Sequence, residues 1–263
     1  MDALPVVERT GLPYASIQKA KYNGLEVGVM HACGHDGHTT ILQGAAEELA
    51  NSLDFDGTVI FIFQPNEENG LGAKAMLNEG ILSSFPISEI FALHNLPGTE
   101  TGRIITRKGL ICSSESLFEI SLKGQGGHAS MPHVGRDTIS VGSEIIQSLQ
   151  NIISKKLAPG SGSVLSVTEF TSDGARNVLP GNSLIKGDVR SRNKEDRLEI
   201  KRLMSTIVEG ISDAHEITGK VSFETEFVET INSSDQTETV IAVAEELGLS
   251  LDGNCEPMSF SED

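Results

Sequence analysis

The order of predicted elements between residues 115 and 229 is the feature that most limits the folds open to this chain. Residues 115–124 alternate polar and apolar side chains as a half-buried strand does, and residues 137–157 have the spacing of an amphipathic helix. A pair of strands, a second long helix and a last strand follow at 161–174, 182–192, 194–216 and 220–229. The order β-α-β-β-α-β is the ferredoxin-like pattern of an α+β domain.

The residues before this region follow a different order, in which helix and strand alternate. Residues 38–52 and 71–82 have helical spacing, whereas 57–65 and 87–98 are apolar runs of strand length. Continuous apolar strands are typical of sheets that are covered on both faces. The alternation therefore predicts a doubly wound α/β layer.

The change of pattern after about residue 104 predicts the domain boundaries. We expect residues 105–230 to form a domain that is inserted into the α/β domain. The α/β domain then consists of residues 1–104 and 231–263, and its second part has a helix at 237–248.

The charge and the termini exclude several classes of function. A net charge of −17 argues against a general affinity for nucleic acid or for an anionic membrane, since both need a basic surface. No apolar run approaches the roughly 20 residues of a membrane span, and the first residues lack the pattern of a signal peptide. Three scattered cysteines do not make a disulfide framework, so the expected compartment is the cytoplasm.

Three polar clusters lie at turns of the predicted α/β layer. They are HACGHDGH at 31–38, QPNEE at 64–68 and LHNLPG at 93–98. In open α/β sheets, ligands bind beyond the carboxyl ends of the strands, so we expect these clusters to meet. A thiolate, two imidazoles and a carboxylate form a mixed ligand set for zinc, manganese, cobalt or nickel, and a second carboxylate remains for proton transfer. The candidates are Cys33, His35, Glu67, Glu68 and His94.

Other interpretations of the same residues remain open at this point. Cys33 could be the nucleophile of a hydrolase with a histidine base, although this leaves the two adjacent glutamates without a task. His31 and His38 taken alone are more typical of structural or helix-start histidines. Asp36 is more typical of a residue that orients a histidine or caps a helix.

Six motifs in the chain resemble those of a known enzyme family. They are MDALP, GVMHACGHDGHT, FQPNEENGLGAKAM, ALHNLPG, GGHASMPH and NVLPG, in family order. They resemble the amidohydrolase branch of the dinuclear metallopeptidases, which includes hippurate hydrolase, N-acyl-L-amino-acid amidohydrolases, N-acetyldiaminopimelate deacetylase and auxin-conjugate hydrolases. The resemblance implies a doubly wound, metallopeptidase-like catalytic domain with an inserted ferredoxin-like lid or dimerisation domain.

The resemblance also implies a role for each matching residue. Two divalent metal ions, whether manganese, zinc, cobalt or nickel, would activate a water that attacks the amide of an N-acyl amino acid, such as hippurate or an N-acetyl substrate. Glu67 would be the general base, and Asp2 would orient a ligand histidine. The lid histidine, His128, would reach the partner subunit's site in a homodimer or larger oligomer. The implied metal ligands are Cys33, His35, Glu68 and His94, and the implied substrate-binding residues are His128, Asn177 and Arg190.

The two ends of the sequence depart from the family pattern. Met1 lies inside a motif that a substantial segment precedes in the family, and the final SED resembles the start of a longer motif. The resemblance places a last ligand histidine beyond Asp263. We therefore expect an internal fragment of a longer enzyme, with an incomplete catalytic domain. The alternative is a non-catalytic remnant that keeps only dimerisation and partial metal binding.

Overall fold

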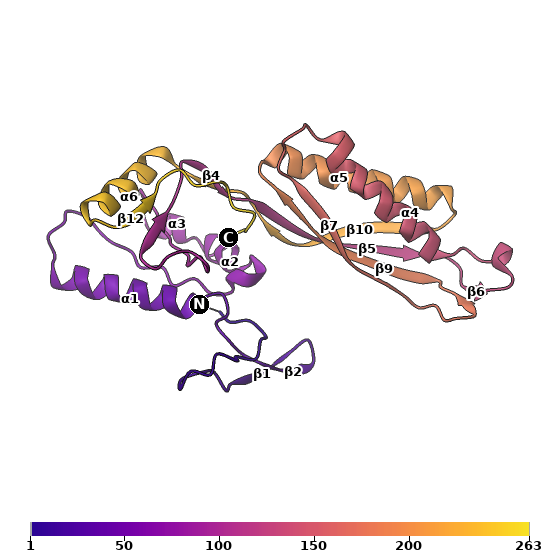
Figure 1. Cartoon of the computed structure of the whole chain (residues 1–263), viewed down its shortest axis with the longest axis horizontal. Helices are drawn as coiled ribbons and strands as arrows, with labels where there is room; N and C mark the ends of the chain where they lie inside the picture. The colour runs from indigo at the N-terminus through magenta and orange to yellow at the C-terminus, as the bar shows by residue number, and fades with distance from the viewer. Residues whose placement is uncertain (1, 263) are drawn as a thin grey trace. The chain divides into compact units, whose positions relative to one another are not determined.

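The computed structural model describes residues 2–262, apart from the side chains of residues 225 and 226. Contacts divide the chain into two compact units, one from Met1 to Arg103 and the other from Ile104 to Glu262. Figure 1 shows the elements of both units along the chain. Among the described residues, no helix is both long and apolar enough to cross a membrane.

A four-stranded antiparallel sheet with two long helices forms the main part of the second unit. Its strands lie in the order β10-β5-β9-β7, and α4 and α5 cover one face (Figure 1). This is the strand order of the ferredoxin-like pattern, so the predicted order of elements is confirmed here. The bounds are β5 Ser114–Lys123, α4 Thr138–Asn151, β7 Val164–Ser172, β9 Asn182–Ser191, α5 Lys194–Ala214 and β10 Thr218–Phe227. A π-helical turn, η3 at Ile152–Lys156, extends α4.

Local sequence explains where the two helices begin. The Asp137 carboxylate accepts hydrogen bonds from the N–H groups of Ile139 and Ser140 at the start of α4. Asn193 accepts a hydrogen bond from the N–H of Asp196 at the start of α5. Both are side chains that satisfy backbone donors which the first helical turn leaves unpaired.

The core of the second unit lies between the helices and the covered face of the sheet. Alternate residues of β5 and β9 are buried, as a strand with one covered face requires. Gly142 allows α4 to approach the sheet closely, because a Cβ there would lie 2.6 Å from the Phe170 ring. The fully buried apolar side chains at this interface include Ile120, Ile145, Leu149, Ile185, Ile200, Met204 and Val208.

Truncation of Ile145 tests this core. Its side chain is 0% exposed on α4, so Ile145→Ala removes apolar contacts and leaves a cavity. We expect a loss of about 2–5 kcal/mol in the free energy of unfolding of the second unit, measured by urea titration. The control is Ile139→Ala on the same helix, where the side chain is 43% exposed and the loss should be much smaller. Equal losses for both variants would contradict the observed packing.

The rest of the second unit consists of short elements. Strand β4 pairs with β11, β12 pairs with β3, and β6 pairs with β8. Residues 231–262 belong to this unit by their contacts, whereas their membership of the α/β domain stays a prediction. The bounds are β3 Arg103–Ile105, β4 Gly109–Cys112, β6 Gly127–His128, η2 Pro132–Val134, β8 Val178–Leu179, β11 Thr230–Asn232, α6 Ser234–Glu246 and β12 Ser250–Asp252.

The first unit consists of a hairpin and a series of helices. The predicted helix at 38–52 begins earlier, at residue 35, directly after Gly34 with its φ of 84°. The predicted helix at 71–82 is two helices, which meet at Gly80 with a φ of 88°. A left-handed glycine cannot continue a helix, which explains both boundaries. The bounds are β1 Lys19–Tyr22, β2 Leu25–Gly28, α1 His35–Asn51, η1 Glu67–Asn69, α2 Gly72–Asn78 and α3 Ile81–Ser84.

The predicted strands at 57–65 and 87–98 are wrong for this structure, since neither run is part of a strand. The doubly wound layer is therefore not formed among the described residues of the first unit. A strand is stable when a neighbouring strand pairs with its backbone N–H and C=O groups, and among the described residues no strand pairing includes either run. Their large side chains are correspondingly accessible, with Phe63 50%, Ile90 69% and Phe91 53% exposed.

Candidate metal centre

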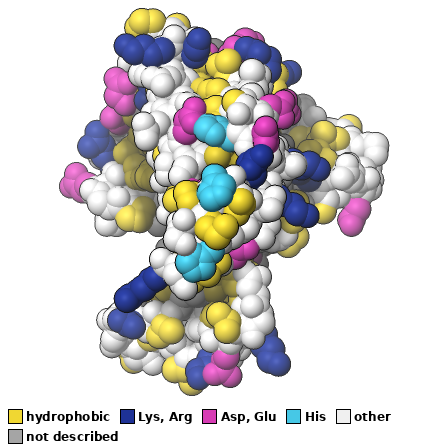
Figure 2. All heavy atoms as spheres, turned by 90° about the vertical axis from the view of Figure 1, so that its right-hand side faces the viewer, with side chains coloured by type: hydrophobic (Ala, Val, Ile, Leu, Met, Phe, Trp, Pro, Cys, Tyr) yellow, Lys and Arg dark blue, Asp and Glu magenta, His cyan; other side chains and the backbone are white. Residues whose placement is uncertain are grey.

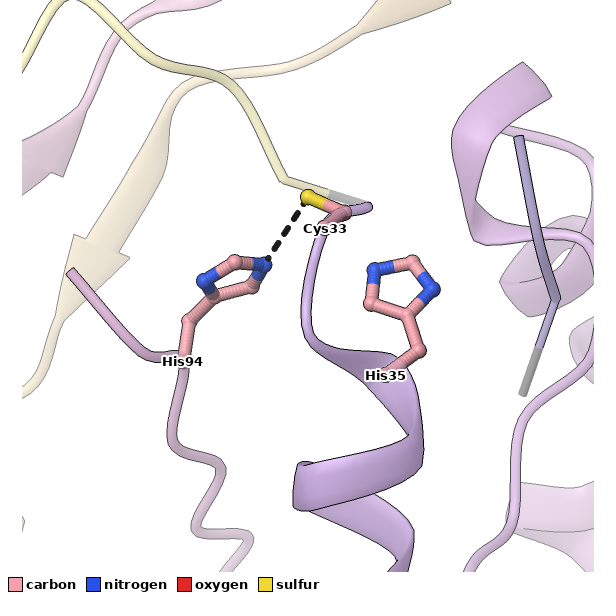
Figure 3. Close-up of side chains that lie close together, drawn as sticks. All are labelled: Cys33, His35 and His94. Carbon is pink, nitrogen blue, oxygen red and sulfur yellow. Dashed lines mark hydrogen bonds between the residues drawn. The ribbon is translucent and has the colours of Figure 1, made fainter. Parts of the chain in front are cut away.

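Cys33, His35 and His94 lie close together in the first unit (Figure 3). Cys33 is in the turn before α1, His35 is the first residue of that helix, and His94 is in the predicted cluster at 93–98. One ligand atom from each lies within 4.8 Å of the others, and Sγ of Cys33 is 3.5 Å from Nε2 of His94. A thiolate and an imidazole on one tetrahedral zinc ion lie roughly 3.6 Å apart, by their usual bond lengths. The observed separation fits that geometry.

Both candidate ligand histidines are held through Nδ1. Nδ1 of His35 is 2.7 Å from Oδ1 of Asp2, and Nδ1 of His94 is 2.7 Å from the backbone oxygen of Asn95. Oxygen acceptors at Nδ1 hold the proton there, so each Nε2 has its lone pair available for a metal ion. The predicted role of Asp2, to orient a ligand histidine, is consistent with this contact.

Two glutamates lie on the other side of the His35 ring. Its Nε2 is 3.6 Å from Oε2 of Glu67 and 4.0 Å from Oε1 of Glu68. The N–H of Glu68 donates to Oδ2 of Asp2 at 3.0 Å, so Asp2 connects the glutamate turn to the histidine. Asp2, His35 and Glu67 form a second group whose atoms could hold a metal ion.

Oε1 of Glu68 indicates that the donor set suits a cation. This oxygen is buried and has no hydrogen-bond partner among the described residues. A buried carboxylate oxygen without a partner is costly, and a divalent cation would compensate for it. A thiolate, two imidazoles and carboxylates are a ligand set that zinc, manganese, cobalt and nickel accept. The residues present therefore fit the metal ions that the sequence predicts.

The remaining polar residues of the first cluster have supporting contacts. Nδ1 of His31 is 2.7 Å from the backbone oxygen of Asp2, which agrees with a structural role. Nε2 of His38 contacts Asn95. The pKa of His38 is lowered, first because burial disfavours the imidazolium and then because His94 is close. Asn95 was not identified from the sequence as a residue that supports the candidate ligands. Its position next to His94 in the sequence is the one feature that could have indicated this role.

Two residues that the sequence assigns to substrate binding meet in the second unit. The N–H of Ala129, which follows His128, donates to the oxygen of Asn177 at 3.0 Å. Nδ1 of His128 accepts from the N–H of Ser130 at 3.2 Å. A backbone N–H can only donate, so a neutral His128 carries its proton on Nε2. Figure 2 faces the end of the unit where β6 lies, and histidines there lie among hydrophobic side chains.

Arg190 is the third residue that the sequence assigns to substrate binding. It lies near the C-terminal end of β9, and its guanidinium group already binds other residues of the second unit. Its Nε donates to Asp188 at 2.8 Å and its Nη2 to Glu115 at 2.6 Å. Nη1 makes two bonds, to Oγ of Ser261 at 3.0 Å and to the oxygen of Ser259 at 3.4 Å. Four of the five guanidinium N–H groups therefore have partners. The role in binding a substrate carboxylate stays a prediction, because a bidentate pair would have to displace one of these bonds.

Replacement of Arg190 separates the two roles. Arg190→Leu leaves the partly buried Glu115 and Asp188 carboxylates without their cation, so we expect a loss of about 2–4 kcal/mol in the free energy of unfolding of the second unit. The control is Arg202→Leu, whose partner Glu199 is exposed, with an expected loss below about 1 kcal/mol. Urea titration measures both. Unchanged stability with a raised KM would favour substrate binding instead.

Comparison with known proteins agrees with these features. The profile of peptidase family M20/M25/M40 matches residues 1–263. The hippurate hydrolase of Campylobacter jejuni is 36% identical over 267 residues, which is 100% of this chain and 67% of that protein. Two Bacillus subtilis proteins are also similar. N-acetyldiaminopimelate deacetylase is 33% identical, and the match covers 94% of this chain and 63% of that protein. N-acetyl-L-cysteine deacetylase is 36% identical, and the match covers 85% of this chain and 51% of that protein.

Two solved structures are similar over almost the whole chain. One is a protein from methicillin-resistant Staphylococcus aureus that is described as an aminohydrolase, with a TM-score of 0.86 and 33% identity, covering 100% of this chain and 67% of that one. The other is a dinuclear metal-binding peptidase of the M20 family from Bacillus subtilis, with a TM-score of 0.77 and 31% identity. The match covers 99% of this chain and 65% of that one. The chain thus spans between about half and two thirds of the proteins it matches.

Proposed function

The chain belongs to peptidase family M20/M25/M40, and from that premise we propose that it carries the metal centre of an enzyme that hydrolyses the amide bond of N-acyl amino acids. The observation that carries this proposal is the meeting of Cys33, His35 and His94 beside a buried Glu68 oxygen that accepts no hydrogen bond from the described residues. The names of its relatives, a hippurate hydrolase and several deacetylases, support an N-acylated substrate.

The residues divide into ligands and a proton carrier. Cys33, His35, Glu68 and His94 would hold two divalent ions, a number that the dinuclear peptidase from Bacillus subtilis supports. Divalent metal ions supply Lewis acidity, which lowers the pKa of a water molecule towards neutrality. The Glu67 carboxylate, 3.6 Å from Nε2 of His35, would accept the proton of that water and pass it to the leaving amine.

The second unit would supply the groups that hold the substrate. His128 carries a proton on Nε2 when neutral, and such a donor stabilises the charge that develops on a carbonyl oxygen. The backbone oxygen of Asn177 accepts from the N–H of Ala129, the residue after His128, and its side-chain amide would contact the same substrate. We propose that the chain forms a homodimer through this unit, in which His128 of one copy serves the metal centre of the other.

A panel of substrates tests the proposal. Hippurate and N-acetyl amino acids are incubated with the chain and added manganese, cobalt, zinc or nickel, and the release of the free amino acid is measured. We expect hydrolysis of the acylated substrates, whereas dipeptides with a free amino terminus should be poorer because they lack the acyl group. Bound metal without hydrolysis of any substrate would contradict the enzyme and favour a non-catalytic remnant.

A further inference from the structure

Asn95 contacts both chain segments that supply the candidate ligands Cys33 and His94. Its backbone N–H donates to Nε2 of His38 at 3.0 Å, which ties it to α1. Its own carbonyl oxygen is 2.7 Å from Nδ1 of His94. One residue therefore links the first turn of α1 to the ring of a candidate ligand.

The Asn95 side chain strengthens the same link. Oδ1 lies 2.9 Å from Nε2 of His38. Since this nitrogen accepts from the Asn95 N–H, it has no proton to donate to Oδ1, and a half-turn of the amide would let the NH₂ group share the same lone pair. His94 and Asn95 are both exposed, so packing alone does not fix them. The hydrogen bonds to His38 therefore help to hold this segment.

The turn that carries Cys33 is shaped to receive the Asn95 amide. A Cβ on Gly34 would lie 2.3 Å from Oδ1 of Asn95, so any other residue type there would displace the amide. Gly34 also has a φ of 84°, in the left-handed region that favours glycine. Cys33 directly precedes this glycine, so the amide packs against the turn that carries the thiol.

The three imidazole rings pack against one another. The His38 and His94 rings are 4.3 Å apart between centroids and tilted by 65°, and the His38 and His35 rings are 5.6 Å apart. His38 is not a member of either group of potential ligands. Its ring packs against the rings of the candidate ligands His35 and His94, where it can restrict their movement.

We propose that Asn95 and His38 are positioning residues that hold the Cys33 thiolate and the His94 imidazole at the separation of ligands on one metal ion. Asn95 fixes the proton of His94 on Nδ1, and His38 anchors Asn95 to α1. Ligands that are already in place lose less conformational freedom when the ion binds, so affinity rises. This inference rests on the proposed metal centre and adds the residues that preorganise it.

Titration of the chain with Co²⁺ tests the inference without a measurement of activity. A cobalt–thiolate bond absorbs in the near ultraviolet, so the band reports the Cys33 ligand directly. We expect His38→Ala, which removes both bonds to Asn95, to weaken Co²⁺ binding by about 10- to 100-fold and to reduce the thiolate band at saturation. Asn95→Ala removes only the side-chain contact and keeps the backbone bonds to His38 and His94, so we expect it to weaken binding in the same direction but by less. The control is Asn51→Ala at the exposed end of α1, which should bind as the wild type does.

The double variant sharpens the test. Because His38 and Asn95 act through the same hydrogen bonds, His38→Ala with Asn95→Ala should weaken binding no more than the stronger single variant. Circular dichroism checks folding, and His38→Gln replaces Asn95→Ala as the informative variant if the latter does not fold. Additive effects of the two substitutions would contradict a shared mechanism.

The outcomes separate this inference from the metal centre itself. Wild-type affinity and an unchanged band in Asn95→Ala and the His38 variants, with loss of the band in Cys33→Ser, would overturn the positioning role and leave the centre intact. Absence of a thiolate band in the wild-type chain, or its persistence in Cys33→Ser, would overturn both.

Discussion

Glu67→Gln is expected to lower kcat for N-acyl amino acid hydrolysis by about 100- to 10,000-fold, the usual contribution of a general base. Glutamine keeps the size of the side chain but cannot accept the proton of the water. The proposed role rests on the position of this carboxylate, whose Oε2 is 3.6 Å from Nε2 of the candidate ligand His35. The change in kcat is measured from initial rates of hippurate hydrolysis, in the presence of the metal ion that supports the highest activity.

The control for this prediction is Glu47→Gln, on the exposed face of α1. It removes the same charge from the first unit but lies outside the candidate centre, so the rate should not change. Metal content should stay near the wild-type value in Glu67→Gln, since that carboxylate is assigned to proton transfer. Retention of full activity by Glu67→Gln would show that another group is the base.

Removal of metal is expected to abolish hydrolysis. Dialysis against a chelator should reduce activity to the background rate, and addition of a divalent ion should restore it, because the proposed chemistry depends on a metal ion that activates water. Activity is followed with hippurate before chelation, after it, and after titration with manganese, zinc, cobalt or nickel. The native metal is the one that restores most activity at the lowest free concentration.

The same experiment decides between metal catalysis and a cysteine nucleophile. Sγ of Cys33 is 3.5 Å from Nε2 of His94, which is also a distance that suits a thiolate and its base. A cysteine hydrolase would lose activity to an alkylating reagent but keep it after chelation. Cys112 does not complicate the result, because burial raises the pKa of its thiol to about 11 and slows alkylation. Chelator-resistant activity would contradict the metal mechanism.

The sequence predicted the second unit well because its pattern is local. Alternation in β5 and β9, helical spacing in α4 and α5, and capping residues such as Asp137 are all readable over short windows. The strands at 57–65 and 87–98 were predicted from apolar character alone. Whether such a run becomes a strand depends on a distant partner, and the sequence of the run does not reveal it.

The candidate site was predicted in part. Cys33, His35 and His94 come together as expected, although the argument used strands that the structure does not form. Asn95 could not be assigned, because its partner His38 is 57 residues away and the pairing depends on tertiary structure. The pairing of Arg190 with Glu115 depends likewise on the register between β5 and β9.

Metal binding by the chain tests the central claim most directly. Equilibrium dialysis against manganese, cobalt or zinc, followed by elemental analysis, gives the affinity of the wild type, Cys33→Ala and Glu68→Ala. The account predicts that the wild type binds a divalent ion and that both substitutions weaken binding by at least about 10-fold, since each removes a proposed ligand. Equal metal binding by all three proteins would contradict it.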